Sequence, residues 1–177
     1  MKYRKENDEV FYAVGDSVRV TRAEVEFVKT GARDSIRGRC RLCLHSDPGA
    51  KIHQMLIAHT GGIYVRPHKH IGRSESFQLI DGALCVVVFD SRGTVTDVVS
   101  MDNSDVGCPF LYRIPADCFH TVLLLSSMVV FLETTGGPFN PSETVFAPWA
   151  PPVEKKDELS LYRQKLDLEI NQWPDKK

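Results

Sequence analysis

Two histidines and a glutamate lie close together in the sequence, at His68, His70 and Glu75, between the glycines Gly62 and Gly82. The surrounding residue types favour β-strand, and residues two apart on a strand point to the same side, so both imidazoles would face one space. The short polar link after His70 would let the chain reverse and return the Glu75 carboxylate on the next strand. Two nitrogens and one oxygen suit a divalent transition metal. The spacing therefore predicts part of a metal site.

The spacing of these five residues resembles the first signature motif of the cupins, a superfamily of small metal-binding β-barrels. The second cupin motif has a core of Pro-x-Gly-x-x-His, and residues 115–120 (PADCFH) resemble it with Asp117 in the glycine position. Aspartate is favoured in turns and can enter the left-handed region, so it is a tolerable substitute. Two positions depart from the motif, because Pro109 replaces a glycine and Leu124 an asparagine. The resemblance implies that His120 is a fourth metal ligand.

Three imidazoles and one carboxylate would leave a six-coordinate metal with two adjacent positions for water, substrate or oxygen. Fe(II), Mn(II), Ni(II), Co(II) and Zn(II) all accept such ligands, so we expect one divalent transition metal without choosing among them. A structural zinc site is normally closed by four ligands in a tetrahedron. An open site in the mouth of a barrel therefore indicates a function.

Two further side chains of the first motif are candidates for a role near the metal. Tyr64 and Arg66 have the strand parity of His68, so they point into the same interior unless Pro67 introduces a bulge. There Tyr64 could donate a proton as a catalytic residue, and Arg66 could bind a carboxylate or phosphate of the substrate. A surface or inter-sheet salt bridge is the alternative for Arg66.

Glu133 is the third candidate, because it follows an apolar run at residues 128–132. A carboxylate is costly to bury unless it is paired or functional. Glu133 is therefore either a catalytic acid or base that lines the cavity, or the structural partner of a residue such as Arg39 or Arg41.

Short strand-like runs separated by turn signals fill most of the chain from Ile52 onward. About eight such runs predict an antiparallel barrel or jelly roll. Together with the motifs, they predict a mainly β protein with a cupin-type double-stranded antiparallel β-barrel. We expect one domain over residues 1–177, with the barrel core at about 36–135.

Helical spacing at both ends of the chain predicts one α-helix on each side of the barrel. The N-terminal helix should span about residues 22–33, with Thr21 as N-cap and Glu24 completing a capping box. The C-terminal helix should span about residues 154–171. Between barrel and helix, the proline-rich residues 136–152 should wrap the barrel surface as extended or turning chain.

The composition is that of an ordinary soluble globular protein, with 42% hydrophobic and 25% charged residues. A formal net charge of −1 gives no reason to expect nucleic acid or an anionic membrane as a partner. The first nine residues contain no apolar h-region of a signal peptide, and the longest apolar run, at residues 83–89, is far too short to cross a membrane. Five irregularly spaced cysteines argue against a disulfide framework. We therefore expect a cytoplasmic protein.

Segments outside the two motifs resemble the WbuC-type cupin fold metalloproteins, a bacterial group found among proteins of surface-polysaccharide and O-antigen gene clusters. The segments that carry this resemblance are Arg39-x-Arg41-x-x-x-His45, residues 54–58, Phe89-Asp90, residues 137–139 and residues 146–151 (FAPWAP). No established substrate comes with the group. Cupins often pair through barrel edges, which need covering, so a homodimer is expected.

Three functions follow from these observations and stay open at this point. The first is a metal-dependent isomerase or epimerase acting on a small oxygenated molecule such as a sugar or sugar nucleotide, with Glu133 or Tyr64 moving a proton. The second is an Fe(II)-dependent dioxygenase. The third is a non-catalytic carbohydrate-binding or accessory metalloprotein, so the sequence leaves open whether the protein is an enzyme.

Overall fold

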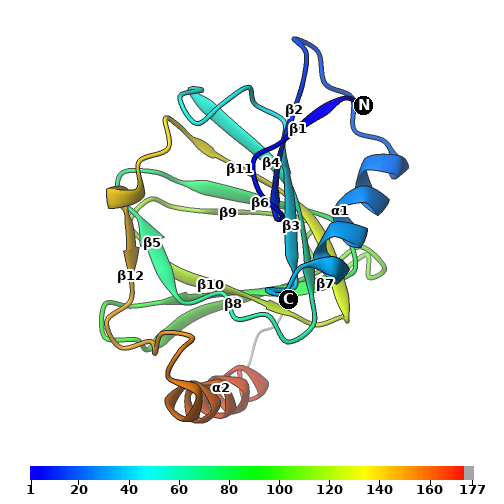
Figure 1. The fold of residues 1–177 in the computed structure, drawn as a ribbon. Coiled ribbons are helices and arrows are strands. Elements are labelled where there is room, and N and C mark those ends of the chain that lie inside the picture. The colour runs from blue at the N-terminus through cyan, green and yellow to red at the C-terminus, as the bar shows by residue number, and fades with distance from the viewer. Residues whose placement is uncertain (174–177) are drawn as a thin grey trace.

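Two facing β-sheets form the body of the protein in the computed structural model, which describes residues 1–173 (Figure 1). The seven-stranded sheet has the order β1-β2-β3-β4-β11-β6-β9, and the five-stranded sheet has the order β12-β5-β10-β7-β8. The strands of the first sheet are β1 (Tyr3–Lys5), β2 (Val10–Ala13), β3 (Arg39–Cys43), β4 (Ile52–Thr60), β11 (Met128–Gly136), β6 (Glu75–Asp81) and β9 (Leu111–Ile114). The strands of the second are β12 (Thr144–Phe146), β5 (His68–His70), β10 (Phe119–Leu124), β7 (Ala83–Phe89) and β8 (Val95–Asp102).

The eight strands β4 to β11 form a jelly roll. Strands β4, β11, β6 and β9 are neighbours in one sheet, and β5, β10, β7 and β8 are neighbours in the other, with antiparallel pairing throughout. This double-sheet arrangement is the one that cupins use. The expected mainly β fold of the cupin type is therefore confirmed, with one helix before the barrel in the chain and one after it.

Helix α1 (Arg22–Asp34) covers the outer face of the seven-stranded sheet. The predicted capping box is present, because the Thr21 hydroxyl accepts from the Ala23 amide and the Glu24 carboxylate accepts from the Thr21 amide at 2.8 Å. Val28 and Ala32 are fully buried against β3, β4 and β11. The helix thus excludes water from one face of the sheet and leaves the other face to the barrel interior.

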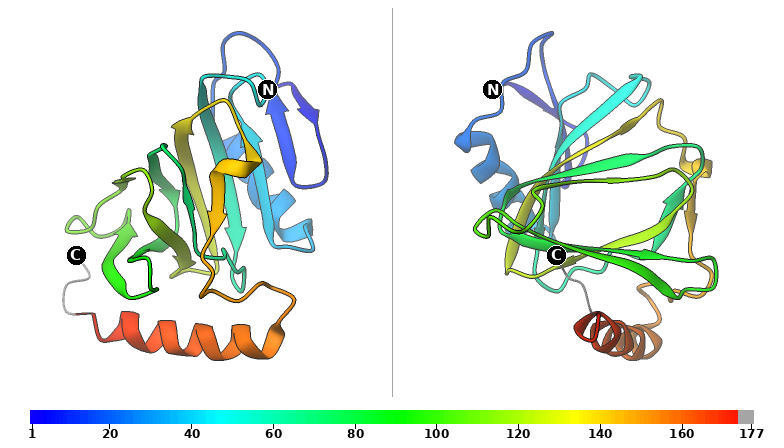
Figure 2. Two further views of the ribbon diagram at one scale, coloured as in Figure 1. Left: turned by 90° about the vertical axis from the view of Figure 1, so that its left-hand side faces the viewer. Right: turned by 180° about the vertical axis from the view of Figure 1, so that it is seen from behind.

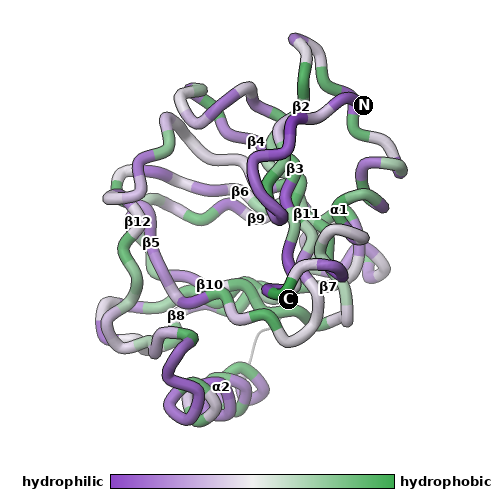
Figure 3. Tube along the Cα trace, in the orientation of Figure 1, coloured by the Kyte–Doolittle hydropathy of each residue, from purple (hydrophilic) through white to green (hydrophobic). Residues whose placement is uncertain are grey.

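Helix α2 (Lys156–Asn171) packs on the five-stranded sheet, on a different side of the barrel from α1 (Figure 2). Its buried residues Leu166 and Ile170 lie in one cluster with Val87 and Phe89 of β7. Trp149 joins this cluster, with its ring centroid 4.9 Å from that of Phe89. Figure 3 shows the contrast between apolar β7 and β10 and the largely hydrophilic α2. No helix within residues 1–173 is both long and apolar enough to cross a membrane.

The segment between barrel and α2 includes one strand that the sequence did not predict. Residues 144–146 form β12, which pairs with β5 at the edge of the five-stranded sheet, and a one-turn 3₁₀-helix at Pro141–Glu143 precedes it. These three residues contain no proline, so every amide can join a ladder. The prolines before and after them confine regular pairing to this short piece.

The N-terminal hairpin of β1 and β2 extends the seven-stranded sheet, and β2 pairs with β3 in parallel. Glu9, directly before β2, accepts hydrogen bonds from Arg37 Nε at 2.6 Å and from Arg39 Nε at 2.9 Å. Ser35 donates to the same carboxylate at 3.1 Å. Although partial burial raises the pKa of Glu9, these donors outweigh burial and lower it to about 2. The hairpin is therefore tied to the chain that follows α1 by one ionised carboxylate.

We predict that Gly82→Ala destabilises the protein much more than Gly62→Ala. Both glycines have positive φ, +81° and +89°, which costs an alanine about 1 kcal/mol. A Cβ at Gly62 would meet no atom within 4 Å, whereas one at Gly82 would collide with the backbone oxygen of Met128. Urea unfolding should show a loss in the free energy of unfolding of about 1 kcal/mol for Gly62→Ala and about 3 kcal/mol for Gly82→Ala. Equal losses for the two variants would contradict the collision.

Glu9→Gln should lower the free energy of unfolding by about 1–2 kcal/mol at pH 7, after allowance for solvent screening of the arginines. The folded pKa of about 2 lies below the unfolded value near 4.5, so this stability is fully present above about pH 5 and is lost as the pH falls toward 2. Urea unfolding of both proteins between pH 7 and pH 2.5 should show the difference shrinking with acid. Glu6→Gln, in an exposed pair with Arg4, is the control and should change little.

Candidate metal centre

Four side chains from three strands meet inside the barrel. His68 and His70 come from β5, Glu75 from the start of β6 and His120 from β10, and one ligand atom of each lies within 4.8 Å of all the others. His120 and His68 are directly paired on neighbouring strands. Glu75 reaches them from the opposite sheet, so the group forms only when the two sheets face each other. A group of this kind can hold a metal ion.

Backbone carbonyl oxygens orient two of the imidazoles. Nδ1 of His68 lies 2.9 Å from the oxygen of Arg66, and Nδ1 of His120 lies 3.0 Å from the oxygen of Cys118. A carbonyl oxygen only accepts, so each Nδ1 must carry the hydrogen, and a neutral ring then has its lone pair on Nε2. Metal-binding histidines are typically held by such outer hydrogen bonds.

The third imidazole, of His70, is oriented by a side chain from the C-terminal segment. The Thr144 hydroxyl on β12 lies 3.1 Å from Nδ1 of His70. Nothing in the spacing of residues 136–152 marked this threonine, because its role depends on the unexpected pairing of β12 with β5. The inner nitrogen of His70 faces the carboxylate of Glu75.

Glu75 lies between two imidazoles and is only 5% exposed. Its oxygens lie 3.1 Å from Nε2 of His70 and 3.0 Å from Nε2 of His120. Burial alone would raise the pKa of Glu75, but the contacts with His120 and His70 outweigh it and hold the pKa far below its usual range. A lone pair on Nε2 and a carboxylate oxygen repel each other unless a positive charge, either a proton or a metal ion, lies between them.

The chemistry of these donors fits a divalent cation. Burial, followed by the nearby His120, lowers the pKa of His68 to about 4, so this ring is neutral at pH 7 and presents its Nε2 lone pair. Neutral imidazole and ionised carboxylate are the forms that bind a metal. His68 and Glu75 are therefore in the protonation states that metal binding requires, and the rings of His70 and His120 add two further nitrogens to the group.

The turn before His120 forms as its sequence predicts. Asp117 has φ of +64°, in the left-handed region. Its amide donates to the oxygen of His70 at 3.1 Å, and its carboxylate accepts from the Gly72 amide at 3.3 Å. Aspartate in the glycine position of the motif thus links the turn before β10 to the end of β5.

Glu133 on β11 faces the barrel interior, because it pairs directly with the buried Phe77 and Met55. Its side chain is half-buried and makes no hydrogen bond or ion pair with residues 1–173. Burial, and then the negative charge of Glu75, raise the pKa of Glu133 to about 8, while the positive charge of Arg41 opposes this rise. The alternative of a structural ion pair with Arg39 or Arg41 is not observed.

Tyr64 and Arg66 do not point into this interior, and the parity argument for them is wrong. Residues 63–67 form no strand, so alternation does not apply. The Tyr64 hydroxyl donates to the oxygen of Pro151 at 2.9 Å, and Arg66 donates to the oxygens of Ala150 at 3.0 Å and Ala147 at 3.2 Å. Both side chains anchor the C-terminal wrap.

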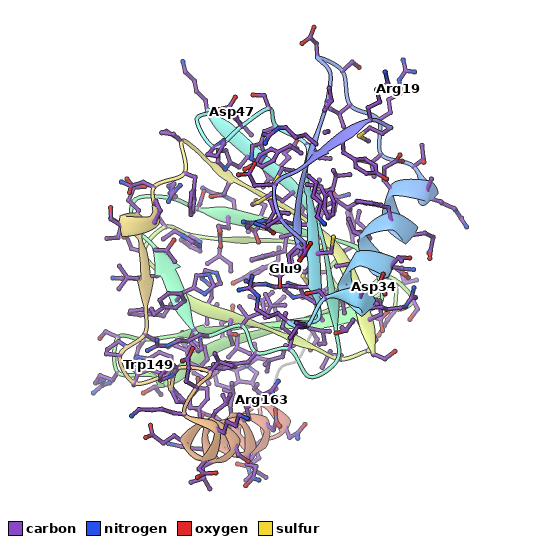
Figure 4. All side chains as sticks on the ribbon, in the orientation of Figure 1. Glu9, Arg19, Asp34, Asp47, Trp149 and Arg163 are labelled. Carbon is purple, nitrogen blue, oxygen red and sulfur yellow. The ribbon has the colours of Figure 1, made fainter. Side chains whose placement is uncertain are left out.

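Helix α2 holds the chain just before these two residues. Arg163, labelled in Figure 4, donates from Nη2 to the oxygens of Gly62 and Ile63 at 3.1 and 2.6 Å. The backbone that leads into β5 is therefore fixed by α2 on one side. The wrap holds the next residues through Tyr64 and Arg66.

Comparison with sequence families gives one match, over part of the chain. A family model described as a domain of unknown function, DUF6016, matches residues 20–101, which is less than half of the chain. No curated protein matches the chain at a significant level.

Solved structures resemble the chain at low sequence identity. Protein SO0799 from Shewanella oneidensis is 12% identical with a TM-score of 0.50, over 76% of this chain and 82% of that one. The cupin domain of Schizosaccharomyces pombe Cnp3 is 13% identical with a TM-score of 0.43, over 55% and 64%. The capsular polysaccharide assembling protein CapF from Staphylococcus aureus is 16% identical with a TM-score of 0.46, over 60% and 34%. The jelly-roll strand order is that of a cupin-type fold, and the first similarity, at a TM-score of 0.50, agrees with a shared fold.

Proposed function

We propose that the protein is a metal-binding cupin that holds one divalent transition metal through His68, His70, Glu75 and His120. The proposal rests on one observation, the convergence of these four ligand atoms within 4.8 Å. The outer nitrogens of the three rings are already engaged, so the inner nitrogens are directed at the shared space. Fe, Mn, Ni, Co and Zn all remain compatible with these ligands.

The substrate that this centre supports best is a small oxygenated molecule such as a sugar or sugar nucleotide, and the reaction is isomerisation or epimerisation. A bound metal would supply a Lewis acid for adjacent substrate oxygens. Glu133 would move the proton, because its carboxyl has no partner among residues 1–173 and lies on the inner face, diagonally across the β6–β11 pair from Glu75. With Tyr64 engaged by the wrap, Glu133 is the remaining candidate acid or base among those that the sequence indicated.

We also propose that the protein belongs to the WbuC-type group and acts in O-antigen metabolism. It would be a cytoplasmic homodimer. The segment resemblances given above, above all residues 146–151 (FAPWAP), support the group. Pairing through a barrel edge is supported by β9, an edge strand whose Leu111 and neighbouring Phe110 are 51% and 60% exposed. We also propose that residues 1–177 form one domain.

We predict that the wild-type protein binds one metal per chain, and that His68→Ala and Glu75→Gln each weaken binding at least 100-fold. Elemental analysis after dialysis against each metal measures the stoichiometry. Metal at 100 times its Kd should also add about 2.7 kcal/mol to the stability of the wild type alone. His45→Asn is the control, because His45 stacks on His53 outside the centre. Full metal content in the His68 and Glu75 variants would refute the site.

Glu133→Gln should keep the metal and lower turnover by about 100-fold or more if Glu133 moves the substrate proton. Deuterium incorporation from D₂O into candidate sugars or sugar nucleotides, followed by NMR, measures this step. Glu158→Gln, the same substitution at an exposed position, is the control and should have no effect. Unchanged exchange in Glu133→Gln would exclude the role. Substrate-dependent oxygen uptake with Fe(II) would instead establish a dioxygenase, and saturable saccharide binding without turnover a binding protein.

A further inference from the structure

Arg41 lies on the inner face of the seven-stranded sheet, and its side chain has no partner among residues 1–173. Cys40 and Leu42 on β3 are buried under α1, so the alternate residues Arg39, Arg41 and Cys43 face the other side. Cys43 confirms this direction, because it belongs to the core between the two sheets. The Arg41 side chain is exposed and makes no hydrogen bond or ion pair with residues 1–173.

The neighbouring arginine shows that this lack of a partner is specific to Arg41. Arg39 lies on the same strand and the same face, and Glu9 neutralises it at 2.9 Å. Arg41 lies in register with Val10 of β2 and Ile57 of β4, neither of which can accept a hydrogen bond through its side chain. The guanidinium therefore carries an uncompensated positive charge on the inner face.

The charge of Arg41 acts on the same interior as Glu133. Burial raises the pKa of each of Tyr12, Cys43 and Glu133, and Arg41 opposes that rise in all three. Strand β11, which carries Glu133, is two strands from β3, a separation of about 10 Å. Arg41 aligns with Phe131 through Ile57, so Glu133 lies two strands away and two residues further along. An anion held by Arg41 would thus enter the same interior as the proposed proton-transferring group.

An aromatic side chain lies across the interior from Arg41. Phe146 on β12 is in register with His68 and therefore on the same face of the five-stranded sheet. It is 53% exposed, and its ring centroid lies 6.2 Å from that of His68. In Figure 1, β12 and β5 lie across the interior from β3. The open side of the barrel thus has an aromatic wall next to the metal centre, with the Arg66 guanidinium carbon 5.2 Å from the Phe146 ring centroid, and a further cation, Arg41, on the facing sheet.

We propose that Arg41 binds a carboxylate or phosphate group of the molecule whose other oxygens lie at the metal centre, so that the preferred ligand is an anionic small molecule. This inference rests on the proposed function, because it takes the metal centre as the other anchor. The planar guanidinium can bind either group through two parallel hydrogen bonds. Phe146 would pack against the carbon skeleton between the two anchors.

The experiment uses ligand pairs that differ only by a distal anion. Calorimetry with Mn(II)-loaded protein would compare glucose 6-phosphate with glucose, and 2-hydroxyglutarate with 2-hydroxybutyrate. In at least one pair, we expect the compound with the distal anion to bind at least 10-fold more tightly than its partner. Arg41→Gln should reduce that ratio of Kd values to about 2-fold or less. The first pair tests a phosphate and the second a carboxylate. Metal content and thermal midpoint of Arg41→Gln should equal those of the wild type.

Arg19→Gln is the matched control, because it removes one positive charge far from β5 and β12 (Figure 4). It should leave both ratios unchanged, and a loss equal to that in Arg41→Gln would show a net-charge effect and overturn the proposal. Metal-loaded wild type without preference in either pair, or a preference that survives Arg41→Gln, would overturn it as well. If the protein binds no metal, the proposed function fails. Inorganic phosphate binding to metal-free protein that disappears in Arg41→Gln would then still support the anion site, and no binding would end it.

Discussion

The contact of one buried carboxylate with two imidazole nitrogens is the constraint on which the centre depends. Glu75 comes from one sheet and the histidines from the other, so the contact exists only in the closed barrel. In a neutral His120 the hydrogen is already committed to the backbone oxygen of Cys118, and Nε2 would face the carboxylate lone pair to lone pair. A proton or a cation must separate them, and a divalent metal satisfies all four donors at once.

Two of the histidines are oriented by residues close to them in the sequence, and the third is oriented by a distant residue. His68 and His120 each bind the backbone oxygen two residues earlier, so their orientation is determined locally by the conformation before the strand. His70 depends instead on Thr144, in the segment that follows the barrel. That segment is held in turn by Arg66, and the Ala147 amide donates to the oxygen of Pro67 at 2.8 Å. The C-terminal wrap is thereby coupled to the metal centre.

The sequence predicts those parts of the site whose geometry follows from local rules. Spacing on a strand brings His68 and His70 together, and the turn preference of aspartate explains Asp117 at φ +64°. The capping box at Thr21 is equally local. The prediction for Tyr64 and Arg66 is wrong, because strand parity holds only where a ladder exists. The role of Thr144, and the lack of a partner for Arg41 within residues 1–173, depend on pairings between distant segments, which no spacing reveals.

Arg41 and Glu133 carry opposite formal charges on the inner face of one sheet, and yet they form no ion pair. A guanidinium on its long side chain could approach a carboxylate two strands away if that pairing were the favoured state. Glu133 lies instead among buried apolar residues and near the charge of Glu75, both of which disfavour its ionised form. A protonated carboxyl attracts a cation weakly and can still donate a hydrogen bond. The same interior thus keeps a proton donor, Glu133, and an anion-binding cation, Arg41, available to one ligand. An ion pair between the two side chains would leave neither of them available.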